Sequence, residues 1–247
     1  MVTIQCGSAT FSSIQAVIFD KDGTLADSQE YLRNLAHKRA RLIDARIPGV
    51  QEPLLMAFGA ESDRLSPAGL MAVGTRHENE IAAAAYVAET GRDWIEARAI
   101  VRSAFEEADQ VFKRKADQTP VLEDGRSLVR DFAAVNLKLA LLSSDTTENV
   151  RDFAQRYELE PYFQCMLGTD EGTPSKPHPY LLQHVSQQLG VEPETVLVVG
   201  DSQVDVELAR NANAAGCIGV TWGGATAAQL LGAAAIVSQF DQIQVLP

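Results

Sequence analysis

A short apolar segment that leads into two aspartates constrains the fold of this chain most. Residues 14–19 are mostly apolar and rich in β-branched side chains, and Asp20 and Asp22 follow directly. Such a segment predicts a strand buried on both faces, as in a parallel sheet. Ligands bind at the carboxyl ends of strands in open α/β sheets. Two adjacent carboxylates repel each other there, so the pattern predicts a nearby cation, most simply a divalent metal. The alternative is an Asx-type turn in which aspartate and glycine serve only geometry.

The position of the next strand predicts a second domain. A comparable apolar segment covers residues 137–142, so residues 20–136 separate the two. A simple βαβ unit needs only about 30 residues. We therefore predict a domain inserted at residues 27–117, and a first domain formed by residues 1–26 and 118–247.

The insert has the periodicity of helices. Leucine and isoleucine recur at helical spacing over residues 32–43, and an alanine-rich segment of high helix propensity covers residues 78–90. Asp93 and Glu96 have the spacing of a capping box, and the residues that follow, from Trp94 to Phe112, place apolar side chains on one face. These patterns predict an all-helical inserted domain.

Strand and helix patterns alternate after the insert. Strands are expected at residues 137–142, 163–168, 195–199, 217–220 and 235–237, and helices at 125–135, 145–157, 179–189, 204–213 and 225–231. This alternation predicts an α/β fold, a Rossmann-like parallel sheet with helices on both faces. Asp145 and Glu148 predict a second capping box, and residues 1–13 are expected to be a disordered or edge segment.

Composition limits the partners of this chain. The formal net charge of −12 argues against binding nucleic acid or an anionic membrane through bulk electrostatics. It leaves a phosphorylated substrate possible, because a local metal and a lysine can reverse the field of a pocket. No stretch approaches the roughly 18 apolar residues that span a bilayer, and no signal peptide pattern starts the chain. We expect a cytoplasmic protein, and the sequence predicts no oligomeric state.

Polar residues follow three of the predicted strands, and in a parallel sheet they would meet at one edge. They are Asp20 with Asp22, Ser143 with Ser144, and Asp201 with Asp205, while Lys176 precedes a predicted helix. Magnesium prefers oxygen ligands. A carboxylate can also act as a nucleophile, and a second acid can move protons. These groups suit phosphoryl transfer, although each residue alone also fits a turn, a cap or an ordinary surface position.

Four segments resemble the motifs of the haloacid dehalogenase superfamily of phosphohydrolases. They are IFDKDGTL at residues 18–25, LLSS at 141–144, SKPHP at 175–179 and VVGDSQVD at 198–205. The resemblance covers about residues 14–26 and 120–240 and is strongest to the phosphoglycolate phosphatase-like and β-phosphoglucomutase-like branch. It implies a catalytic core and an inserted α-helical cap that closes over the substrate.

The resemblance also implies roles for particular residues. Asp20 would be the nucleophile and Asp22 the general acid and base. Mg²⁺ would be held by Asp20, Asp201 and Asp205 and by the backbone carbonyl of Asp22. Branches that cleave other bonds resemble this motif but lack an acid at the position of Asp22, so that residue argues for phosphate esters.

The phosphoryl group would be bound by Ser143 and Lys176 in the same resemblance. Ser144 stands where relatives often have asparagine, which leaves open the hydrogen bond that the neighbouring position makes. Within the insert, Arg76, His77 and Glu78 form a dense polar cluster that could recognise the leaving group. The alternative is that they are simply the polar start of a helix.

The function that this resemblance implies is that of a Mg²⁺-dependent phosphomonoesterase with an aspartyl-phosphate intermediate. Its substrate would be a small phosphorylated metabolite, either phosphoglycolate-like or a sugar phosphate. One alternative is a sugar phosphomutase of the β-phosphoglucomutase type. Another is a phospho-accepting regulatory module without turnover.

Overall fold

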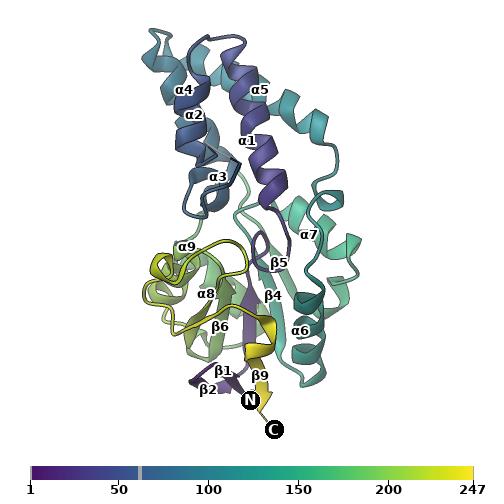
Figure 1. Cartoon of the computed structure of the whole chain (residues 1–247). Coiled ribbons are helices and arrows are strands. Elements are labelled where there is room, and N and C mark those ends of the chain that lie inside the picture. Colours follow the sequence, from purple (N-terminus) through teal and green to yellow (C-terminus); the bar gives the residue numbers. More distant parts are fainter. Residues whose placement is uncertain (1, 61–62, 247) are drawn as a thin grey trace. The chain divides into compact units, whose positions relative to one another are not determined.

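The computed structural model describes residues 2–60 and 63–246. The chain divides into two compact units (Figure 1). The helical unit is Ser28–Gln118, and the α/β unit consists of the residues on either side of it. No helix in the described ranges combines the length and the apolar character needed to cross a membrane.

The α/β unit is built on a six-stranded sheet with the order β5-β4-β3-β6-β7-β8. Its strands, in chain order, are β3 (Ala16–Phe19), β4 (Lys138–Leu142), β5 (Cys165–Leu167), β6 (Val196–Gly200), β7 (Gly216–Val220) and β8 (Ala235–Val237). Every neighbouring pair is parallel. The predicted parallel α/β sheet is therefore confirmed, with β3 between β4 and β6.

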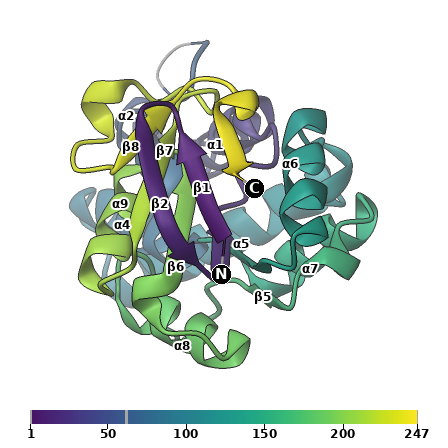
Figure 2. The ribbon, with the colours of Figure 1, turned by 90° about the horizontal axis from the view of Figure 1, so that it is seen from below.

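Helices cover both faces of this sheet. They are α6 (Glu123–Ala134), α7 (Thr147–Arg156), α8 (Tyr180–Leu189) and α9 (Gln203–Asn211). One apolar cluster joins the sheet to Phe132 of α6 and Phe153 of α7, and a second joins it to Leu182 of α8 and Leu208 of α9. Figure 2 shows α6 and α7 on one side of the sheet and α8 and α9 on the other. Strands buried on both faces account for their nearly continuous apolar sequence.

A second sheet, antiparallel and three-stranded, joins the two ends of the chain. Its order is β2-β1-β9, from β1 (Val2–Cys6), β2 (Ala9–Ile14) and β9 (Ile243–Leu246). The expected disorder is therefore wrong for residues 2–13, although β2 does lie at an edge of this sheet, and Met1 lies outside the described residues. Ile14 also belongs to β2 rather than to the first strand of the large sheet. The reason is non-local: β1 is stabilised by pairing with β9, almost the whole chain away.

Two local predictions in the α/β unit are also corrected. Thr146, not Asp145, caps α7, because its side chain accepts a hydrogen bond from the amide of Asn149 at 3.3 Å. The helix expected at 225–231 is only the 3-10 turn η4 (Ala227–Gln229). The remaining short turns of this unit are η2 (Glu160–Tyr162), η3 (Pro193–Thr195) and η5 (Phe240–Gln242).

The helical unit packs its helices around a core of its own. They are α1 (Gln29–Asp44), α2 (Gln51–Phe58), α3 (Leu70–Val73), α4 (Arg76–Glu89), α5 (Trp94–Phe112) and the 3-10 turn η1 (Lys115–Asp117). Asp93 caps α5 as predicted, by accepting hydrogen bonds from the amides of Ile95 and Glu96, both at 3.0 Å. The Glu96 carboxylate binds Arg92 instead of completing a capping box, and Trp94 is 44% exposed rather than buried on the apolar face.

Candidate active site

Three carboxylates meet at the carboxyl edge of the large sheet. Asp20 follows β3, Asp201 follows β6 and Asp205 lies in the first turn of α9. One carboxylate oxygen from each residue lies within 4.8 Å of the other two. The amide of Asp20 donates to the carbonyl of Val199 at 2.8 Å, which extends the pairing of β3 with β6 to the aspartate itself. The structure thus brings together these three predicted metal ligands.

Lys176 lies between two of these carboxylates. Its Nζ donates to Asp20 Oδ1 at 2.6 Å and to Asp205 Oδ1 at 2.7 Å, and the residue is only 6% exposed. Burial acts to lower the pKa of this ammonium, but the charges of Asp20 and Asp205 outweigh burial and raise it. Lys176 is therefore a permanent cation directly beside Asp20.

One lysine does not balance the three carboxylates. Burial raises the pKa of Asp20 to about 7, against the effect of Lys176 and reinforced by the charge of Asp205. Burial, followed by the charges of Asp20 and Asp205, also raises the pKa of Asp201 well above its usual value. A divalent cation would relieve this repulsion, and three carboxylate groups are the donors that a hard cation prefers. The residues present therefore fit Mg²⁺.

Glycines hold the Asp201 carboxylate in a tight backbone cradle. Gly23 has φ of +81°, and a Cβ there would lie 2.1 Å from Asp201 Oδ2, while one on Gly223 would lie 2.2 Å from the same atom. Trp222 Nε1 donates to the carbonyl of Thr24 at 3.0 Å and ties the two loops together. Trp222 and Gly223 were not predicted from the sequence. The available signal was that both lie within three residues of the end of the predicted strand 217–220.

Asp22 belongs to a different group of charges. Its Oδ2 lies 2.7 Å from Lys21 Nζ, and the same nitrogen lies 3.0 Å from Asp145 Oδ2. Lys21 is fully buried. The Asp22 carboxylate is thus held by a lysine instead of joining the cluster of Asp20. A role for Lys21 was not predicted from the sequence. Its position between two aspartates at the end of a buried strand was the signal that could have indicated one.

The two serines lie in the loop after β4. Ser143 is buried, and its Oγ accepts a hydrogen bond from the amide of Asp145 at 3.1 Å. Its carbonyl accepts a hydrogen bond from Thr169 Oγ1 at 3.2 Å, which fixes this loop against the residue after β5. Ser144 is partly exposed beside it.

The polar cluster predicted to recognise substrate lies in the first turn of α4. Thr75 and Glu78 form a capping box, with hydrogen bonds of 3.1 Å and 2.7 Å between each side chain and the other residue's amide. Arg76 binds Glu80 at 2.9 Å and also binds Asp109. His77 is exposed. Arg76 and Glu78 therefore have binding partners within the helical unit.

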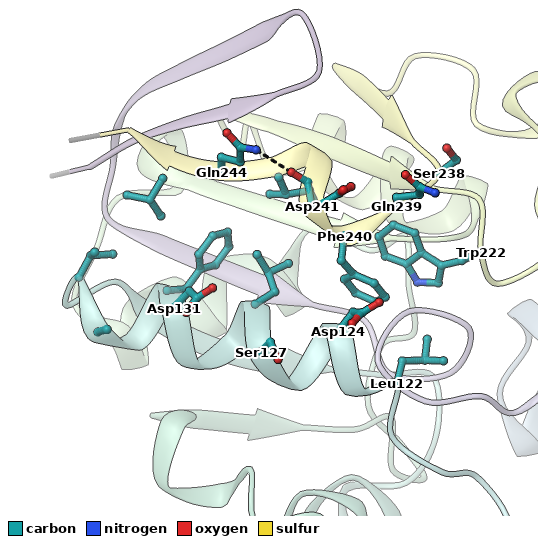
Figure 3. A pocket seen from close by; sticks show the side chains of 16 residues that line it. Leu122, Asp124, Ser127, Asp131, Trp222, Ser238, Gln239, Phe240, Asp241 and Gln244 are labelled. Atoms are coloured by element: carbon teal, nitrogen blue, oxygen red, sulfur yellow. Dashed lines mark hydrogen bonds between the residues drawn. The ribbon is translucent and has the colours of Figure 1, made fainter.

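A groove of about 1170 Å³ lies elsewhere in the α/β unit, between α6 and the segment from η5 to β9. Figure 3 shows Asp124 and Asp131 on the helix facing Asp241 and Gln244 of that segment. The Trp222 ring stacks on Phe240 at a centroid distance of 3.9 Å. Trp222 lines this groove and also contacts the loop that follows β3, but the carboxylate cluster does not line it.

Comparison with known proteins agrees with this geometry. The sequence profile of the haloacid dehalogenase-like hydrolases matches residues 14–213. Phosphoglycolate phosphatase of Escherichia coli is 28% identical over 216 residues, which cover 86% of this chain and 83% of that enzyme.

Solved structures share the fold. A predicted phosphoglycolate phosphatase from Haemophilus somnus superposes with a TM-score of 0.66 at 18% identity, over 93% of this chain and 96% of the other. A protein assigned as a β-phosphoglucomutase from Thermotoga maritima gives 0.58 at 22% identity, over 93% and 96%. The chain therefore belongs to the haloacid dehalogenase-like hydrolase family, as a phosphatase similar to the phosphoglycolate phosphatases.

Proposed function

We propose that this protein is a Mg²⁺-dependent phosphomonoesterase that acts through an aspartyl-phosphate intermediate. The observation that carries the proposal is the carboxylate cluster at the end of β3, with the Lys176 ammonium 2.6 Å from Asp20. The substrate would be a small phosphorylated metabolite, phosphoglycolate-like or a sugar phosphate. The similarity to phosphoglycolate phosphatases over most of the chain supports this class.

The metal would be held by the carboxylates of Asp20, Asp201 and Asp205, with the backbone carbonyl of Asp22 as a further ligand. When bound, Mg²⁺ would supply positive charge to the phosphoryl oxygens and relieve the repulsion among the carboxylates. The raised pKa values of Asp20 and Asp201 support this assignment, because they reflect negative charge that Lys176 alone leaves uncompensated.

In the first half-reaction, a carboxylate oxygen of Asp20 would attack the phosphorus. The bond from phosphorus to the ester oxygen breaks, and Asp22 donates a proton to the leaving oxygen. Lys176, the Ser143 hydroxyl and the neighbouring Ser144 would bind the phosphoryl oxygens. Lys176 suits this role because its charge is fixed and buried beside the attacking group.

In the second half-reaction, water would attack the phosphorus of the aspartyl phosphate. Asp22, now deprotonated, accepts the proton of that water. The bond from phosphorus to the Asp20 oxygen breaks, inorganic phosphate leaves, and both carboxyl groups return to their starting states.

We assign the predicted cap, residues 27–117, to substrate selection. Arg76, His77 and Glu78 remain the candidates to recognise the leaving group. Arg76 and Glu78 have partners in the helical unit, so His77, with its exposed side chain, is the first to test. Replacing His77 with alanine should raise KM for the best substrate without a matching loss of kcat.

The deciding experiment is a panel of phosphate esters assayed for phosphate release with and without Mg²⁺. We expect Mg²⁺-dependent release, its loss in Asp20→Asn, and its retention in Asp131→Asn, a matched change at an exposed aspartate of α6. Trapping the aspartyl-phosphate intermediate of the unmodified protein should add the mass of one phosphoryl group. Full activity of Asp20→Asn would refute the mechanism. Interconversion of hexose phosphates would indicate a mutase, and a persistent acyl phosphate without turnover a regulatory module.

A further inference from the structure

The buried lysine between the two aspartates has no role in the mechanism above. We propose that Lys21 is a positioning residue that holds the Asp22 carboxylate in place and connects it to the loop after β4. The inference rests on the proposed function, because it takes Asp22 as the group that protonates the leaving oxygen.

Burial shows that the site is built around this ammonium. Lys21 is fully buried, whereas lysines normally extend their charged end into water. A buried charge is tolerated only where partners compensate it. Here the partners are two carboxylates, Asp22 at 2.7 Å and Asp145 at 3.0 Å, and the ring of Phe153, whose centroid is 5.8 Å from Nζ. The side chains of Asp22 and Asp145 are themselves only 14% and 12% exposed.

The lysine also keeps two carboxyl groups together. Both contact the same nitrogen, so without that donor Asp22 would lose its connection to Asp145 and move toward water. Lys176 holds Asp20 and Asp205 in the same way. Each lysine therefore fixes one of the two aspartates that the mechanism uses, Lys176 the nucleophile and Lys21 the proton donor.

Lys21 itself is rigidly attached. Its carbonyl accepts hydrogen bonds from the amides of Thr24, Leu25 and Ala26, at 3.2, 2.9 and 2.9 Å, so the loop is closed on this residue. Asp145, its other partner, donates its amide to Ser143 Oγ at 3.1 Å. Lys21 thus connects Asp22, the proposed proton donor, to the loop after β4. That loop carries the Ser143 hydroxyl, which is proposed to bind the phosphoryl group.

A positioning role and a merely structural role predict different kinetics. Protonation matters greatly when the leaving group is an alkoxide and little when it is a stabilised phenolate. If Lys21 positions Asp22, its replacement should lower kcat/KM for alkyl esters more than for aryl esters. If Lys21 only supports the fold, kcat/KM should fall equally for both kinds of ester.

The test compares Lys21→Met, which keeps the length of the side chain but not its charge, with the unmodified protein. We would measure kcat/KM at saturating Mg²⁺ for p-nitrophenyl phosphate and for the best alkyl phosphate of the panel. We expect a loss of about 10²-fold for the alkyl ester and less than about tenfold for the aryl ester. Asp22→Asn should show the same selectivity. Lys138→Met removes a lysine that binds the backbone of Leu189, and it should leave the ratio unchanged.

Equal losses for the two esters, or no loss, would overturn the inference. If Lys21→Met does not fold, Asp145→Asn removes the charge of the second partner of the lysine and keeps an oxygen that can accept from Thr146 and Asn149. That variant should show a weaker form of the same selective loss, and an unchanged ratio there would also overturn the inference. Failure of the unmodified protein to hydrolyse either ester would instead refute the proposed function, so the two failures are distinguishable.

Discussion

The two units of this molecule both bury charged side chains, but they balance the charge differently. In the α/β unit, Asp20, Asp201 and Asp205 lie close together, and the ammonium of Lys176 binds Asp20 and Asp205. Burial, together with the charge of Asp205, raises the pKa of Asp20 to about 7 in spite of that lysine. Negative charge therefore remains uncompensated at this site.

The helical unit balances its buried charge internally. Arg39 is only 5% exposed and lies with its guanidinium carbon 4.1 Å from the centroid of the Phe105 ring. Asp109 binds Arg39 at 3.3 Å and also binds Arg76, which pairs in turn with Glu80. The charges of these two cations and two anions compensate one another. The cluster therefore needs no ligand to balance its charge.

The difference separates a site that needs a ligand from one that does not. Uncompensated buried charge lowers the stability of the free protein, so it is retained where a cation or substrate will bind. Compensated charge over an aromatic ring contributes to the stability of the unit that contains it. Substitutions in the two units should therefore have different effects on activity and stability.

Replacing Lys176 with methionine should have the largest effect. It removes the cation between Asp20 and Asp205, and with it the charge proposed to bind the phosphoryl group. We expect kcat/KM to fall by about 10³-fold. Arg39→Met is the matched change in the helical unit, and assayed well below its melting temperature it should retain activity within about tenfold. A similar loss in both variants would contradict the contrast.

Replacing Asp109 with asparagine should destabilise the protein. Arg39 would keep its charge in a buried position and lose its anionic partner. Because Asp109 is itself 38% exposed, water moderates the cost, which we place at about 1–2 kcal/mol. This corresponds to a fall in Tm of roughly 2–8 °C, measurable by calorimetry. Glu106→Gln, which breaks an exposed pair with Arg102, is the control and should leave Tm nearly unchanged.

Replacing Asp201 with asparagine should raise Tm, whereas replacing Asp109 should lower it. It removes a carboxylate whose charged form burial and the charges of Asp20 and Asp205 disfavour. The metal-free protein should therefore melt roughly 2–4 °C higher. The stabilisation by Mg²⁺ expected of the unmodified protein should disappear. A lower Tm without metal would indicate that Asp201 supports the fold rather than a ligand.

A change of pH should have a smaller but diagnostic effect on the free energy of unfolding. Burial raises the pKa of the Asp20 carboxyl from its ordinary value of 3.8 to about 7 in the folded, metal-free protein. The folded state binds more protons between these values, so this group makes stability fall as pH rises through that window. Denaturant titrations should show a weaker fall in Asp20→Asn. An equal fall in both proteins would show that Asp20 is not its source.

Local patterns were sufficient to predict the framework of the catalytic unit. Apolar runs ending in polar residues predicted strands such as β4 and β6, and their alternation with helices predicted a parallel sheet. Parallel strands end at one edge, so the meeting of Asp20 and Asp201 followed from the pattern before any coordinates, whereas the place of Lys176 beside them came from the resemblance. The resemblance of four motifs then predicted the family, which the comparison confirmed.

Features that depend on distant partners were not predictable in this way. The pairing of β1 with β9, the second partner of Lys21 and the approach of Gly223 to Asp201 each join segments far apart in the chain. Periodicity describes which side of an element is apolar, but not which residue stands opposite. The sequence alone therefore determined the fold class and the reactive groups. Which charges compensate one another became clear from the folded structure, because electrostatic energy depends on separation in space and on burial.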